Sequence, residues 1–136
     1  MLTVHAYIEV TEPAHGIAFY CDGLGLTVKR RLSPRWIELA GANLPIFLLA
    51  SRPEIADLGT TTARRDYARH WTPVHLDFVV PDLDAMVARL SACGGSLDRA
   101  IKDREYGRIA NMADPFGNGF DLIEFSASGY DAVSRN

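Results

Sequence analysis

Residues 4–25 read VHAYIEVTEPAHGIAFYCDGLG, and residues 74–95 repeat the pattern as VHLDFVVPDLDAMVARLSACGG. An offset of 70 residues aligns His5 with His75 and keeps the order of apolar, acidic and glycine positions. Other aligned pairs are Val4 with Val74, Val10 with Val80, and Gly25 with Gly95. Because an internal repeat determines architecture more firmly than local propensity does, the chain is predicted to fold as two related modules.

Each copy begins as a strand and continues as a helix. The second helix has an N-cap at Asp82, apolar residues at helical spacing and a glycine stop at Gly94. The first helix has Pro13 at its first position and is expected to end at Gly23. Three strand-like runs follow each helix: 26–32, 35–40 and 45–50, then 96–101, 107–113 and 120–125. The pattern predicts an α+β fold made of βαβββ twice.

The two modules are expected to be related by pseudo-two-fold symmetry and to form a curved mixed sheet with a concave cavity. Together they make a single domain over residues 1–136, with module one at 1–50, a linker at 51–72, module two at 73–126 and a tail at 127–136. The polar linker is longer than compact domains usually leave without a role, so it is expected to cover something or to contact a partner. The tail is expected to fray, with the alternative that Tyr130 folds over the cavity.

Composition excludes several classes of partner. With 48% hydrophobic residues, 23% charged residues and a net charge of -3, the chain has no basic surplus for nucleic acid. No apolar run approaches the length of a membrane span, and the N-terminus lacks an export signal, so a cytoplasmic protein is expected. Cys21 and Cys93 form neither a disulfide framework nor a CxxC metal motif and are interpreted as reduced packing residues.

Alternation along the strands separates a packing face from a polar face. In the first strand, Ala6, Ile8 and Val10 are apolar, whereas the opposite face carries His5, Tyr7 and Glu9. The helices bury their apolar stripes against the apolar strand faces, so the second set is expected to line the cavity.

The second module repeats this division. His75 and Asp77 alternate with apolar residues in its first strand. In the last strand, Phe120 and Leu122 match the packing face, so Asp121 is expected to look towards the histidines. Glu124 is then a carboxylate at the rim or surface.

Two imidazoles and one carboxylate converging from three strands suit a divalent metal ion such as Fe, Mn, Ni or Zn, with open positions for substrate. His5, His75 and Asp121 are therefore the candidate ligands. Taken singly, each histidine is also explained as a hydrogen-bonded residue of a half-buried strand. Glu9 and Asp77 are interpreted as cavity wall or as partners that orient a ligand imidazole. Glu9 is also the candidate general base, and Tyr7 is a second candidate catalytic residue.

The remaining candidates are pocket aromatics and linker arginines. Several aromatic residues are predicted to line a pocket for a ring-bearing substrate, and the alternative is packing in the core or at an interface. They are Phe47, Trp36 and Tyr106, with Tyr7, Trp71 and Phe116. Arg69, with its neighbours Arg64 and Arg65, is interpreted as part of a solvated, mixed-charge loop, with anion recognition as the alternative.

The repeat, together with PVHLDFVVPDLDAM at 73–86 and DPFGNGFDLIEF at 114–125, resembles the vicinal oxygen chelate superfamily. This group includes glyoxalase I, extradiol dioxygenases, fosfomycin resistance proteins and bleomycin resistance proteins. The resemblance covers nearly the whole chain and implies a glyoxalase-like fold. It also implies that His5, His75 and Asp121 are the metal ligands.

Two departures from the family pattern bear on activity. The last ligand in the family is usually Glu, whereas Asp121 is one methylene shorter. Glyoxalase I has a fourth acidic ligand in the strand before the linker, where this chain reads PIFLLA, so glyoxalase I activity is disfavoured.

The resemblance implies a small metal-dependent enzyme, a lyase or isomerase or a dioxygenase. Such an enzyme chelates two neighbouring oxygens of a small molecule to the metal. One alternative is a metal-free protein that binds a drug or metabolite, as bleomycin resistance proteins do. Another is a degenerate member that uses the cavity only for assembly. A homodimer is expected, because members of the family commonly close the cavity by dimerising.

Overall fold

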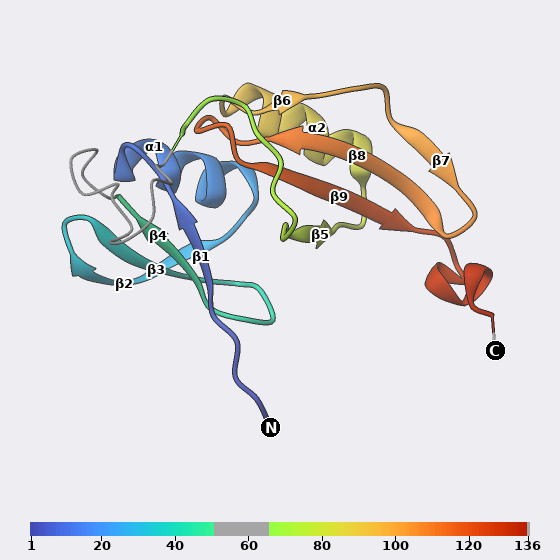
Figure 1. The fold of residues 1–136 in the computed structure, drawn as a ribbon, viewed down its shortest axis with the longest axis horizontal. Coiled ribbons are helices and arrows are strands. Elements are labelled where there is room, and N and C mark those ends of the chain that lie inside the picture. The colour runs from blue at the N-terminus through green and yellow to red at the C-terminus, as the bar shows by residue number, and fades with distance from the viewer. Residues whose placement is uncertain (51–65, 136) are drawn as a thin grey trace. The chain divides into compact units, whose positions relative to one another are not determined.

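The computed structural model describes residues 1–50 and 66–135 and divides into two compact units, Met1–Ala68 and Arg69–Asn136 (Figure 1). Each unit is built around one mixed sheet. Most of the predicted linker, residues 51–65, lies outside the described residues. Among the described residues, no helix combines the length and apolar composition needed to cross a membrane.

The first unit has four strands in the order β1-β4-β3-β2, with β1 parallel to β4 and the other pairs antiparallel. The order along the chain is a strand, two helical segments and three strands. Its elements are β1 (Ala6–Glu9), α1 (Pro13–Ile17), the π-helix η1 (Ala18–Gly23), β2 (Thr27–Ser33), β3 (Trp36–Ala40) and β4 (Ile46–Leu49).

The helical segment packs very close to this sheet at Gly16. A Cβ atom there would lie 3.0 Å from Leu48 Cδ1 and 3.2 Å from Val10 Cγ1. The predicted single helix is wrong in one respect, because the α-helix gives way to π-helical turns after Ile17. Within these π turns, Phe19 and Tyr20 are buried.

The second unit repeats this arrangement with strand order β5-β9-β8-β6, and β7 also pairs with β8. Strand β5 is parallel to β9, and the remaining pairs are antiparallel. Its elements are β5 (Asp77–Val79), α2 (Leu83–Ala92), β6 (Ser96–Leu97), β7 (Lys102–Arg104), β8 (Gly107–Ala113), β9 (Gly119–Phe125) and the 3₁₀-helix η3 (Gly129–Val133).

Helix α2 lies against β8 and β9, and two acids cap its N-terminus (Figure 1). Asp82 Oδ1 accepts from the Ala85 N–H at 3.1 Å, and Glu124 Oε2 accepts from the Leu83 N–H at 2.7 Å. Glu124, interpreted as a rim or surface carboxylate, is half-buried near the end of β9 and also caps this helix. It lies on the helix-packing face of β9, where an acid is stabilised by the free N–H groups of the helix.

The strand predicted at 96–101 is two short strands, β6 and β7, separated by residues 98–101. The break begins at Asp98, whose side chain bonds to residues of the preceding segment. Its carboxylate accepts hydrogen bonds from Arg69 and from Trp71 Nε1, the latter at 2.9 Å. The Asp98 N–H still bonds to Asn111 O at 2.9 Å, and the ladder to β8 resumes only at Lys102.

The predicted α+β fold and the two βαβββ modules are confirmed, since both sheets have the same order and the same single parallel pair. The order places the first and last strand of each module side by side. The residues that these two strands carry on one face are therefore neighbours across a parallel ladder. The curved sheet that joins both modules stays a prediction.

Candidate functional site

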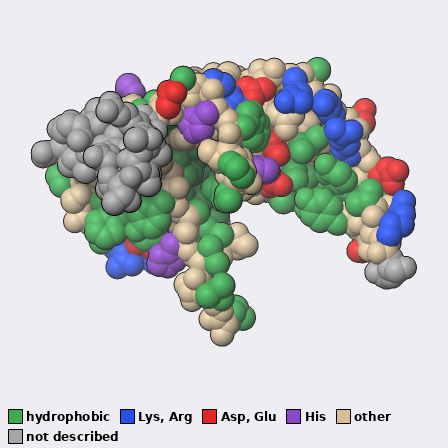
Figure 2. Space-filling view, viewed as in Figure 1, with side chains coloured by type: hydrophobic (Ala, Val, Ile, Leu, Met, Phe, Trp, Pro, Cys, Tyr) green, Lys and Arg blue, Asp and Glu red, His purple; other side chains and the backbone are tan. Residues whose placement is uncertain are grey.

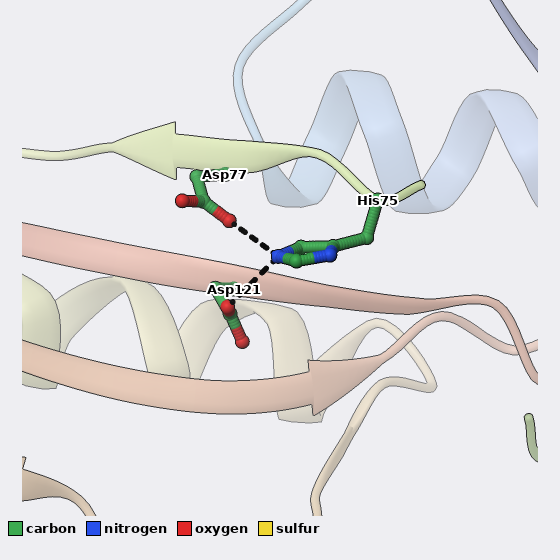
Figure 3. A group of neighbouring side chains, drawn as sticks. All are labelled: His75, Asp77 and Asp121. Atoms are coloured by element: carbon green, nitrogen blue, oxygen red, sulfur yellow. Dashed lines mark ion pairs between the residues drawn. The ribbon is translucent and has the colours of Figure 1, made fainter. Parts of the chain in front are cut away.

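The second unit brings together one imidazole and two carboxylates. Asp77 on β5 and Asp121 on β9 are register partners, so their side chains lie on the same face of the sheet. His75 stands two residues before Asp77 and shares that face. Its Nε2 atom lies 3.1 Å from Asp77 Oδ1 and 3.3 Å from Asp121 Oδ2 (Figure 3). One donor atom from each of the three residues lies within 4.8 Å of the others.

Two neighbours hold the cluster in place. Asn111 on β8 is the register partner of Asp121, and its Nδ2 donates to Asp121 Oδ1 at 2.6 Å. This bond leaves Oδ2 of Asp121 directed at His75. The ring of Trp71 meets the His75 ring edge-on, with centroids 5.7 Å apart and an interplanar angle of 81°. Both acid and imidazole therefore have fixed orientations.

The electrostatics of the cluster favour a cation. Asp121 is only 7% exposed, whereas His75 and Asp77 are open to solvent on one side. Partial burial raises the pKa of Asp77, and the negative charge of Asp121 raises that pKa further. A positive ion between the two carboxylates would offset this repulsion. One nitrogen and two carboxylate oxygens form a donor set that Fe, Mn, Zn or Ni accepts.

Tyr130 lies near the same acids. Helix η3 places its ring 5.3 Å from the Tyr106 ring and 4.7 Å from the Phe125 ring. Burial raises the pKa of the Tyr130 phenol, and the charge of Asp77 raises it further. The tail residue therefore packs on the second unit and remains a neutral phenol there at neutral pH.

The first unit holds the other candidate site residues in an aromatic group. Tyr7 and Phe47 are register partners on β1 and β4, and their rings stack at 4.8 Å and 8°. The rings of His5 and Trp36 lie 5.3 and 6.4 Å from that of Phe47. Glu9 is half-buried at the end of β1, beside Leu49. Since His5 belongs to this unit and His75 and Asp121 to the other, the three-ligand set stays a prediction.

A buried acid in the first unit has no counterpart among the predicted site residues. Glu38 on β3 is 2% exposed and pairs with Arg30 and with Lys29, whose Nζ lies 3.4 Å from Oε1. The Arg30 guanidinium holds the pKa of Glu38 below its usual range. Glu38 is the register partner of Phe47, so it shares the aromatic face. Its position between Ile37 and Leu39 in RWIELA was the sequence signal for a polar-face residue.

Asn111 was not among the predicted site residues, whereas Trp71 was a candidate pocket aromatic. In GRIANMA, Asn111 is two residues after Ile109 and so lies on the same face of the strand. This alternation was the sequence signal for Asn111 as a site residue. Arg69, interpreted as part of a solvated, mixed-charge loop, is exposed and also makes fixed contacts. Arg69 Nε donates to Asp98 Oδ1 at 2.9 Å, and the guanidinium carbon lies 4.8 Å from the Trp71 ring centroid. The segment is anchored because its backbone also pairs with Gly117 and Gly119.

Comparison with known proteins identifies one family. The family described as "Glyoxalase-like domain" matches residues 5–123. Among curated proteins, the chain is 33% identical over 132 residues to anthracycline biosynthesis protein DnrV of Streptomyces peucetius, which covers 94% of this chain and 43% of the relative. It is 35% identical over 122 residues to DauV of Streptomyces sp. strain C5, covering 87% and 40%. The chain thus spans less than half the length of these relatives.

Solved structures show the same fold. A glyoxalase-related enzyme from Fulvimarina pelagi aligns with TM-score 0.70 at 20% identity, covering 95% of this chain and 96% of that one. Fosfomycin resistance protein FosX from Listeria monocytogenes aligns with TM-score 0.69 at 17% identity, covering 94% and 96%. At this level of identity the likeness establishes the fold alone.

Proposed function

The chain belongs to the glyoxalase-like domain family, and on that premise we propose that it is a metal-dependent enzyme acting on a small molecule. The ion is held by His75 and Asp121, with Asp77 beside them. The observation that supports this is the position of His75 Nε2 within 3.1 and 3.3 Å of two carboxylates. When bound, the metal supplies a Lewis acid that chelates and polarises two neighbouring oxygen atoms of the substrate.

The residues of the chain supply orientation and proton handling. Asn111 fixes Asp121 through the 2.6 Å bond to Oδ1, so the other oxygen stays available as a ligand. Trp71 limits rotation of the His75 ring. The shorter reach of Asp relative to Glu is offset by a second acid, Asp77, on the same face. His5 is proposed as a further ligand from the first unit, and Glu9 and Tyr7 as the groups that move protons.

The reaction class is a lyase, an isomerase or, with iron, a dioxygenase. Two curated relatives are named anthracycline biosynthesis proteins, and this supports a polycyclic aromatic substrate with adjacent oxygens. Aromatic residues suit such a ring, and the proposed pocket residues are Phe47, Trp36 and Tyr106.

Metal uptake tests the proposal directly. Purified protein is treated with chelator, and binding of Fe, Mn, Ni, Zn and Co is measured by titration calorimetry and elemental analysis. We expect one ion per chain. His75→Ala should weaken binding by roughly tenfold or more because it removes a donor nitrogen. Asp121→Asn should weaken it to a similar degree because it removes the negative charge of a ligand. Asn111→Leu should weaken it about 10–100-fold without removing a ligand.

His15→Ala is the matched control, since His15 is an exposed helix residue of the first unit and should leave metal affinity unchanged. His5→Ala should weaken metal binding if His5 is a ligand, and should leave metal affinity unchanged if the site is confined to the second unit. If the chain takes up none of the five ions, the metal-dependent proposal fails. The remaining candidate is then a metal-free binding protein, which the half-exposed Tyr7 stacked on Phe47 favours.

A further inference from the structure

A pocket of about 280 Å³ lies on the site face of the second unit. Strand β7 pairs with β8 so that Lys102 faces Ile109, and Ile109 and Asn111 alternate onto the face that carries Asp121. Asn111 belongs both to the pocket and to the cluster, because its amide bonds to Asp121. The lining residues are Trp71, Arg99, Lys102, Arg104, Tyr106, Ile109 and Asn111.

The charge of this pocket is one-sided. Arg99, Lys102 and Arg104 line it, and no acidic residue does. Within residues 1–50 and 66–135, none of these three cations forms a salt bridge, whereas Arg69 and Arg108 are both paired with acids. Figure 2 shows Lys and Arg side chains gathered along β7 and the segment before it. Cations that share a pocket repel one another, and an anion placed between them relieves that repulsion.

The walls of the pocket are aromatic and fixed. Trp71 is held by its Nε1 bond to Asp98 at 2.9 Å, by the Arg69 guanidinium over its ring and by the edge contact to His75. Tyr106 is held by the ring of Tyr130. Trp71 therefore touches the metal cluster through His75 and also forms a wall of the pocket. A volume of about 280 Å³ is near the small end of ligand pockets, which run to about 1,000 Å³.

We propose that this pocket binds an aromatic carboxylate, with the anionic group at Lys102 and Arg104 and the ring against Trp71 and Tyr106. The structure thereby assigns a substrate class, a flat ring that carries a negative charge. The inference rests on the proposed function in one respect, because a ligand of this pocket is the substrate only if it also reaches His75 and Asp121. Binding at the pocket itself requires no metal.

The test uses metal-free protein in chelator, so that it is independent of metal uptake. Titration calorimetry compares 2-naphthoate with 2-naphthalenemethanol, which has the same ring system without the charge. We expect 2-naphthoate to bind at least about tenfold more tightly, because hydrogen bonds to charged groups are stronger than neutral ones. The preference should shrink several-fold when salt is raised, since ions screen the contribution of exposed cations.

Variants identify the residues. The double variant Lys102→Gln/Arg104→Gln should reduce the affinity for 2-naphthoate to that for the alcohol and leave metal uptake intact. Arg108→Gln is the matched control. Arg108 lies on β8 of the same unit but pairs with Asp84 at 2.8 Å. This change should leave the preference for 2-naphthoate in place.

Three results would overturn the inference. They are equal binding of the two naphthalene compounds, retention of the preference in the double variant, or binding of inorganic phosphate as tight as that of 2-naphthoate. The last result would mean that the pocket takes a free oxyanion without the ring. Metal uptake with no preference for 2-naphthoate would contradict this inference and leave the proposed metal chemistry standing. A preference for 2-naphthoate without metal uptake would contradict the proposed metal chemistry and leave this inference standing.

Discussion

The side chain of His75 stands between two carboxylates, but its Nε2 atom carries at most one hydrogen. A neutral imidazole can therefore satisfy only one of Asp77 and Asp121 at a time. A cation bound between the two carboxylates would offset their repulsion without relying on that single hydrogen. The cluster is therefore a candidate metal centre.

Asp77 is predicted to reduce the stability of the metal-free protein at neutral pH. Burial and the charge of Asp121 raise its pKa in the folded state above the unfolded value. The charged form is thus disfavoured by folding, and the cost disappears as the pH falls through the folded-state pKa. In chelator at about pH 7, Asp77→Asn should raise the melting temperature by roughly 2–4 °C, a modest gain because solvent screens a part-exposed group.

The pH dependence of that gain is the diagnostic. Thermal unfolding followed by circular dichroism should show the difference between Asp77→Asn and the unchanged chain shrink as the pH approaches about 4. Asp103→Asn is the control, since Asp103 is 93% exposed and lies 3.7 Å from Arg108. A lower melting temperature for Asp77→Asn at neutral pH would contradict the prediction. In metal-loaded protein the same change should be unfavourable, because it removes a neighbouring negative charge.

At the scale of elements, the N-terminus of α2 depends on an acid from a different part of the sequence. Glu124 on β9 accepts a hydrogen bond from the first N–H of the helix. Its negative charge also helps to raise the pKa of Arg108. Glu124→Ala should lower the free energy of unfolding by about 1–2 kcal/mol, the cost of leaving a partly buried N–H without its acceptor. Urea unfolding measures this decrease in the free energy of unfolding.

Glu105 provides the comparison for that measurement. It is an exposed acid in the turn between β7 and β8, so Glu105→Ala should change the free energy of unfolding by less than about 0.5 kcal/mol. Glu124→Gln keeps an acceptor oxygen and should fall between the two. If Glu124→Ala and Glu105→Ala unfold at the same urea concentration, Glu124 does not stabilise α2.

The elements that the sequence predicts are those with a local signal. Asp82 before an apolar stripe and Gly94 after it define α2, and alternation defines β8 and β9. The break between β6 and β7 has no such signal, because Asp98 is turned by Arg69 and Trp71 from the preceding segment.

The same division applies to the candidate site. Period-two alternation is enough to place Asp77 and Asp121 on one face, since both are strand residues whose neighbours are apolar. It cannot identify Asn111 as the partner of Asp121, because that pairing depends on the register across the β8–β9 turn. The pocket cations could not be grouped from the sequence, because the break after Leu97 sets the position of β7.

At the scale of the whole molecule, the repeat shows how two similar modules carry different chemistry. The offset of 70 residues that aligns His5 with His75 also aligns Tyr7 with Asp77. The partner of Tyr7 across the parallel ladder is Phe47, and that of Asp77 is Asp121. Equivalent positions therefore hold a stacked ring pair in the first unit and a carboxylate pair in the second. The stacked ring pair is suited to contact a flat ring, and the carboxylate pair is suited to hold a cation.

The chain is predicted to form a homodimer, and its exposed apolar side chains are the physical reason. Val74 and Val79 at β5 are 83% and 58% exposed, and Val4 and Tyr7 at β1 are 53% and 50% exposed. Apolar side chains on edge strands favour association, whereas β2 carries the charges of Lys29, Arg30 and Arg31, which protect an edge. Sedimentation velocity at micromolar concentration should give twice the chain mass. Raising the salt should leave the dimer intact, because apolar burial is not screened by ions. A monomer mass under these conditions would rule out the homodimer, and dissociation in high salt would show that charges hold it instead.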